Sequence, residues 1–143
     1  MTARMAARIS PRLRWLIWVA GLALWTYLLV VPVDWLPPWL RFKGTARSRL
    51  LSWSKIGHAS AYAALTAFVP LLPVGLGGRI ALWGLVSAHA FLTELIQTFV
   101  PTRSGELADI AIDHFGMLVG LLLSLLWPSQ WKPPPVQGER HAG

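Results

Sequence analysis

Four stretches of about twenty mostly apolar residues constrain what this chain can fold into. They cover residues 15–33 and approximately residues 56–76, 80–100 and 107–127. A helix needs about 20 such residues to cross roughly 30 Å of hydrocarbon, because it rises about 1.5 Å per residue. The sequence therefore predicts an all-α, polytopic membrane protein with four transmembrane helices in a small antiparallel bundle.

Composition excludes the main alternatives. Of the 143 residues, 55% are hydrophobic and 13% are charged, more apolar surface than a soluble domain of this size can bury. A disordered chain would have low hydrophobicity and high charge, so this composition also excludes disorder. The absence of cysteine excludes disulfides and thiolate metal sites. The net charge of +7 comes from basic residues that flank the apolar stretches, so we expect the lipid bilayer, and no nucleic acid, as the partner.

The segments outside these stretches indicate the domain organisation. Residues 1–14 are predicted to be a basic cytoplasmic N-terminus, 15–127 a membrane domain, and 128–143 a Pro-rich flexible tail. The first apolar stretch is too long for a cleaved signal, and no small-residue cleavage site follows it. The dense arginines before it predict an inner (plasma) membrane protein with both termini in the cytoplasm.

The loop between the first two expected helices is basic, and on this orientation it faces outward. Two interpretations stay open: it touches anionic lipid or polymer, or it is simply solvated. Tryptophan is expected at membrane interfaces, as at Trp15 and Trp18 in the first helix and Trp35 after it.

Polar residues recur at helical spacing within the apolar stretches. Residues three, four and seven apart share one helix face, and lipid cannot satisfy their polar groups, so each stripe is expected to face the bundle interior. The three stripes are Lys55, His58, Tyr62 and Thr66; Ser87, Ala90, Glu94 and Gln97; and Asp109, Asp113, Gly116 and Gly120.

In a serpentine four-helix chain, the polar ends of these stripes meet on one side of the membrane, the outer side if the termini are cytoplasmic. The predicted polar cluster is Lys55, His58, Tyr62, Glu94, Gln97, Arg103, Asp109 and Asp113. Lys55 and Arg103 are expected to neutralise two of the three carboxylates within it. The third would be protonated or hydrogen-bonded to His58.

Three further features complete the polar pattern. Gly116 and Gly120 predict a close approach between two helices. His89 is expected to be an interhelical hydrogen-bond partner, and His114 to pack or to bond a neighbouring carbonyl. No paired-histidine metal motif is present, and neither a metal nor a cofactor is expected.

The polar pattern resembles the VanZ-like family of membrane proteins. Residues 54–62 resemble its Asp-Lys-x-x-His-x-x-x-Tyr signature, with Ser54 in place of the Asp. Residues 94–120 resemble its second signature, with Asp113 in place of an Asn. The second match comprises Glu94, Gln97, Pro101, Arg103, Asp109, Gly116 and Gly120.

The resemblance implies a bacterial cell-envelope protein linked to glycopeptide (teicoplanin) resistance, without supplying a reaction. From the residues, the first hypothesis is a polar outer-leaflet pocket that binds a headgroup or cell-wall precursor, with Lys55 and Arg103 contacting its phosphate or carboxylate. The second is an enzyme acting on a lipid-linked substrate, in which His58 works with Glu94 or Asp109. A transporter and a purely structural bundle also stay open.

Overall fold

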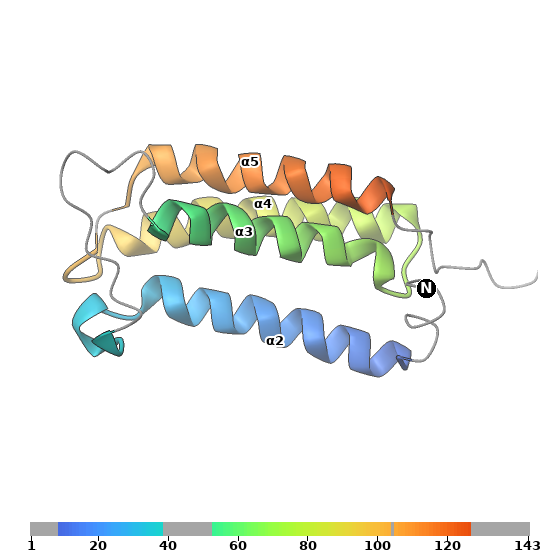
Figure 1. Ribbon diagram of the computed structural model, residues 1–143, viewed down its shortest axis with the longest axis horizontal. Coiled ribbons are helices and arrows are strands. Elements are labelled where there is room, and N and C mark those ends of the chain that lie inside the picture. The colour runs from blue at the N-terminus through green and yellow to red at the C-terminus, as the bar shows by residue number, and fades with distance from the viewer. Residues whose placement is uncertain (1–8, 39–52, 104, 127–143) are drawn as a thin grey trace, which may run out of the picture.

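The computed structural model describes residues 9–38, 53–103 and 105–126. This part contains four α-helices and two 3-10 turns, in the order α2 (Pro11–Val30), η1 (Val33–Trp35), α3 (Trp53–Phe68), η4 (Val69–Leu71), α4 (Leu76–Gln97) and α5 (Leu107–Leu125). Consecutive helices run in opposite directions and form one antiparallel bundle (Figure 1). The described residues contain no strand, so the all-α prediction is confirmed.

Helix α2 begins four residues before the predicted start of the first span. The Ser10 side chain accepts a hydrogen bond from the Leu13 N–H at 3.3 Å, and Pro11 occupies the first helical position, where its missing N–H leaves no bond unmade. Part of the predicted 1–14 tail is therefore helical. The helix ends at Val30 because Pro32 cannot continue it. Residues 1–8 and the predicted tail 128–143 lie outside the described residues.

Helix α3 is shorter than the predicted span over 56–76. It ends at Phe68 after 16 residues, because Pro70 lacks an N–H and its ring clashes with the preceding turn. The chain tightens there into η4, in which the Leu72 N–H bonds the Val69 carbonyl at 3.0 Å. Helix α4 is displaced from its predicted range of 80–100, whereas α5 begins at the predicted residue.

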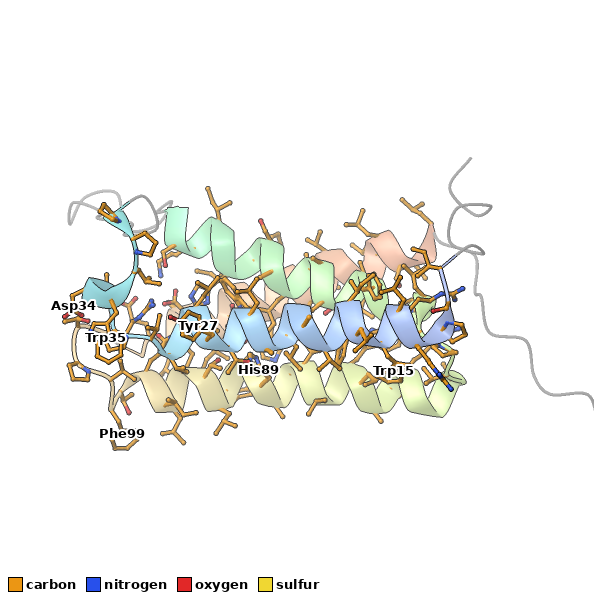
Figure 2. The ribbon with its side chains drawn as sticks, turned by 90° about the horizontal axis from the view of Figure 1, so that it is seen from below. Trp15, Tyr27, Asp34, Trp35, His89 and Phe99 are labelled. Atoms are coloured by element: carbon orange, nitrogen blue, oxygen red, sulfur yellow. The ribbon has the colours of Figure 1, made fainter. Side chains whose placement is uncertain are left out.

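Three helices, α2, α4 and α5, are long and apolar enough to cross a membrane. Their outward faces expose many large apolar side chains, a surface that soluble monomers avoid. Examples are Leu16, Val19, Leu85, Leu92 and Leu118. In Figure 2, Trp15 and Trp35 lie near opposite ends of the bundle, as interfacial tryptophans do. Trp18 is only 4% exposed and belongs to the core, so its ring packs inside the bundle.

The closest packing in the bundle joins α3 and α5. A Cβ atom on Gly116 would clash with the Ala59 carbonyl oxygen, and one on Gly120 would clash with that of Ala63. Only glycine allows the two backbones to approach so closely. The predicted role of Gly116 and Gly120 in close helix packing is confirmed.

Candidate functional site

The polar residues gather at one end of the bundle, where α3 and α5 begin and α4 ends (left in Figure 1). His58, Glu94 and Asp113 are 4%, 3% and 0% exposed, respectively. Each comes from a different helix, and each occupies the interior face that its stripe predicted. Gln97 is also buried, one helical turn beyond Glu94.

Lys55 forms the outer edge of this cluster. Its Nζ lies 2.7 Å from Asp109 Oδ1 and 3.5 Å from Glu106 Oε2. Lys55 therefore neutralises a carboxylate, as predicted, and that carboxylate is Asp109. Glu106, which the sequence reasoning did not single out, is its second partner; its position three residues before Asp109 was the available signal.

His58 pairs with Asp113 in the buried part of the cluster. Its Nδ1 lies 2.9 Å from Asp113 Oδ1. An ionised carboxylate can only accept, so in this pair Nδ1 carries a proton and donates it to Asp113. The Trp25 ring meets the His58 ring edge-on, with centroids 5.4 Å apart. The predicted acid–base partners of His58 were Glu94 or Asp109, but its hydrogen-bonded partner is Asp113, because Lys55 occupies Asp109.

Glu94 is held by the start of α5. Its Oε2 accepts a hydrogen bond from the Glu106 backbone N–H at 2.9 Å. Gly105 permits this approach, because a Cβ there would clash with the Glu94 carbonyl oxygen. Among the described residues, the buried atoms Glu94 Oε1, Gln97 Nε2 and Asp113 Oδ2 have no hydrogen-bond partner. Buried polar atoms normally have one, so these three mark unused binding capacity.

Tyr62 belongs to a separate chain of hydrogen bonds. Thr26 donates to the Leu22 carbonyl at 2.8 Å and so accepts from His89 Nε2, also at 2.8 Å. His89 Nδ1 is then the acceptor for the Tyr62 hydroxyl at 2.9 Å. His89 lies between α2 and α4 in Figure 2. It is an interhelical partner as predicted, and the Tyr62 hydroxyl bonds to it.

His114 makes the predicted bond to a neighbouring carbonyl and a second, unpredicted bond to Ser87. Its Nδ1 donates to the Ile110 carbonyl at 2.8 Å, which makes its Nε2 the acceptor for the Ser87 hydroxyl, also at 2.8 Å. This bond joins α4 to α5 away from the buried cluster.

Arg103 does not neutralise a carboxylate as predicted. Its guanidinium donates to the Leu28 carbonyl at 2.6 Å and to the Val31 carbonyl at 3.1 and 3.2 Å, at the C-terminal end of α2. These carbonyls have no intrahelical partner, and their partial negative charge attracts a cation. Burial lowers the pKa of Arg103. Beside it, Thr102 has a φ of 70° and accepts a hydrogen bond from the Val33 N–H at 3.0 Å, which fixes the loop against η1.

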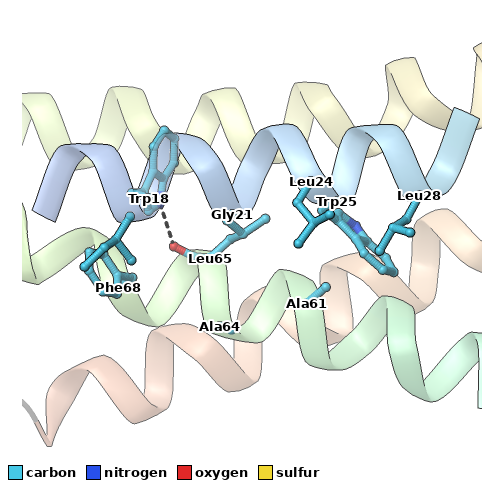
Figure 3. A pocket seen from close by; sticks show the side chains of 10 residues that line it. Trp18, Gly21, Leu24, Trp25, Leu28, Ala61, Ala64, Leu65 and Phe68 are labelled. Atoms are coloured by element: carbon cyan, nitrogen blue, oxygen red, sulfur yellow. Dashed lines mark hydrogen bonds between the residues drawn. The ribbon is translucent and has the colours of Figure 1, made fainter. Parts of the chain in front are cut away.

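Two hollows lie between α2 and α3. A small cavity of about 80 Å³ lies at the polar end. Its polar lining residues are Ser54, His58 and Arg103, and the others are Trp25, Leu28, Leu29, Leu36 and Gly57. An apolar groove of about 310 Å³ lies beside it along the two helices (Figure 3). Trp25 and Leu28 line both hollows, so the groove continues toward the cavity.

Comparisons with protein-family models, curated proteins and solved structures found no match to this chain. The conclusions about its site therefore rest on the residues and their geometry.

Proposed function

We propose that the chain is a VanZ-like, multi-pass protein of the bacterial inner (plasma) membrane that binds an anionic lipid headgroup or cell-wall precursor. The observation that carries this proposal is the cavity at the polar end, which Arg103, His58 and Ser54 line and which adjoins an apolar groove. A cationic site next to an apolar channel suits a ligand with a charged head and a hydrocarbon chain.

The proposal includes four membrane crossings. Helix α3 and η4 together comprise 19 residues, and rises of about 1.5 and 2.0 Å per residue give them a length of about 30 Å. This length suits the hydrocarbon layer. With four crossings both termini lie on one side, and the dense arginines before α2 favour the cytoplasm. The polar end then faces the outer leaflet.

The dimensions of the hollows restrict the ligand. A cavity of about 80 Å³ suits one small anionic group, such as a phosphate, and leaves the remainder of a larger headgroup outside. Arg103 supplies a fixed positive charge, and His58 a polar ring nitrogen, at the cavity wall. The groove from Trp25 to Phe68 suits a hydrocarbon chain. A polyprenyl phosphate, or a phospholipid with an anionic headgroup, has these features.

The test measures lipid retention by the full chain in detergent, using native mass spectrometry. The probes are undecaprenyl phosphate, phosphatidylglycerol and, as a zwitterionic reference, phosphatidylcholine. We expect the two anionic lipids to be retained about tenfold more strongly than phosphatidylcholine, a difference of about 1.4 kcal/mol. Arg103→Gln should abolish this preference. Arg79→Gln, at the opposite end of the bundle, is the matched control and should keep it.

Arg103 also holds the end of α2, so a second variant guards against misfolding. Arg103→Lys keeps the positive charge but loses the fork that spans two carbonyls, and it should retain part of the preference. Equal retention of anionic and zwitterionic lipids by the folded wild-type protein would refute the proposal.

A second candidate function, an enzyme acting on a lipid-linked substrate, is favoured by the His58–Asp113 pair. Asp113 orients the ring so that Nε2 is free to accept a proton, and His58 lines the cavity. An enzyme would turn over purified lipid-linked precursor and lose turnover in His58→Gln while still binding it. Saturable binding without turnover in the wild type supports the binding function alone.

A further inference from the structure

The buried carboxylates at the polar end carry more negative charge than their surroundings neutralise. Among the described residues, Lys55 forms ion pairs with Glu106 and Asp109, and Arg103 bonds backbone carbonyls. Glu94 has no ion pair within this part of the chain, and Asp113 has only His58. An uncompensated buried charge is strongly unfavourable, so these two carboxylates are balanced either by bound protons or by a further cation.

The same three residues have the composition of a metal site. His58, Glu94 and Asp113 each offer one ligand atom, and these atoms lie within 4.8 Å of one another. Ligands on a tetrahedral ion are about 3.4 Å apart when the bonds are about 2.1 Å, so side-chain rotations would have to draw the three atoms closer together. Metal binding through His58 Nδ1 would release the proton that this nitrogen shares with Asp113 Oδ1 across 2.9 Å, so that both atoms could bind one ion.

Two buried oxygens give an independent indication of a missing partner. Glu94 Oε1 and Asp113 Oδ2 have no hydrogen-bond donor among the described residues, although their side chains are 3% and 0% exposed. These are the free oxygens of the two carboxylates in the set. A bound cation would satisfy both, as buried polar groups require.

We propose that His58, Glu94 and Asp113 bind one divalent first-row transition-metal ion at the polar end of the bundle. One imidazole nitrogen with two carboxylates favours Zn²⁺ or Mn²⁺ over Mg²⁺ and Ca²⁺, which prefer oxygen ligands alone. Because His58 also lines the cavity, the ion would lie next to the proposed headgroup site and add positive charge there. This inference goes beyond the proposed function and does not depend on which lipid binds.

The test measures metal content with no lipid ligand added, so its outcome is independent of the proposed function. The full, tag-free chain in phosphatidylcholine nanodiscs is stripped with EDTA, equilibrated with micromolar Zn²⁺ or Mn²⁺, desalted and analysed by plasma mass spectrometry. We expect about one ion per wild-type chain. Glu94→Gln and Asp113→Asn should weaken binding by at least about tenfold.

Matched controls and a stability readout make the test decisive. Asp34→Asn removes an exposed carboxylate at the same end of the bundle, and His114→Asn removes a histidine outside the set; both should bind metal normally. Metal should raise the melting temperature of the wild type but not that of Glu94→Gln, which keeps an acceptor for the Glu106 N–H. The proposal is overturned if the wild-type protein is folded but binds no metal. That result is expected if the two carboxylates share a proton instead of a metal ion. Equal metal content in wild type and both carboxylate variants also overturns it.

Discussion

The two sides of α3 are packed in different ways. Against α5 the backbones nearly touch at Gly116 and Gly120, and the Lys55–Asp109 and His58–Asp113 pairs cross the interface. Against α2 the contact is looser and leaves a groove of about 310 Å³. The difference indicates a division of labour. The α3–α5 side holds the buried charges in place, and the α2–α3 side leaves room for a ligand.

Adding one methyl group to each interface should produce the largest contrast. Gly116→Ala places a Cβ against the Ala59 carbonyl oxygen, and we expect it to destabilise the bundle by about 2–3 kcal/mol. Gly21→Ala is the matched change on the groove side, where the new Cβ would lie 3.8 Å from Leu65 in ordinary contact. It should change stability by less than about 0.5 kcal/mol. Unfolding in SDS titrations measures both, and equal effects would contradict the comparison.

The ion pair at the tight interface should give the next largest effect. Lys55→Ala leaves Asp109 unpaired and should destabilise the protein by about 1–2 kcal/mol. A double-mutant cycle with Asp109→Asn should show a coupling of about 1 kcal/mol, because the two side chains are only 16% and 15% exposed. Arg12→Ala, on the exposed surface of α2, is the control. Strictly additive effects would show that the pair does not hold the interface.

Removing the Tyr62 hydroxyl should have a smaller effect. Tyr62→Phe removes the bond to His89 and should lower stability by about 0.6–1.5 kcal/mol. Because the hydroxyl bonds to His89 and is not a ligand in the proposed site, lipid retention should not change. If Tyr62→Phe lost lipid retention while its stability was unchanged, Tyr62 would be a ligand-binding residue.

Of these variants, one that fills the groove should have the smallest effect on stability and the largest effect on lipid binding. Ala64 lines the groove and is exposed, so Ala64→Phe should shift stability by about 0.5 kcal/mol or less while occupying the space meant for a hydrocarbon chain. Native mass spectrometry should show weaker retention of undecaprenyl phosphate. Leu118→Phe, on the outward face of α5, is the control. If Ala64→Phe retained undecaprenyl phosphate as well as the wild type does, the groove would not be part of the binding site.

The sequence predicted the interior faces of α3, α4 and α5 better than the partners of individual side chains. Helical spacing placed His58, Glu94 and Asp113 on interior faces, because lipid excludes polar groups from the outer surface, and the antiparallel order of the helices brought them to one end. The end of α3 was also readable from Pro70, although the apolar run continues past it. Arg103 was mispredicted because its direction depends on the loop conformation at Thr102, with a φ of 70°, which helical periodicity does not encode.

The central claim is that the cavity and the groove between α2 and α3 bind a lipid with an anionic headgroup. Photo-crosslinking tests this claim most directly. The photoreactive residue p-benzoylphenylalanine replaces Leu24 in the groove or, as a control, Leu122 on the outward face of α5. In nanodiscs of mixed phosphatidylglycerol and phosphatidylcholine, the control should crosslink the lipids in their bilayer ratio. We predict enrichment of phosphatidylglycerol at position 24, lost in Arg103→Gln. The same lipid ratio at both positions would contradict the account.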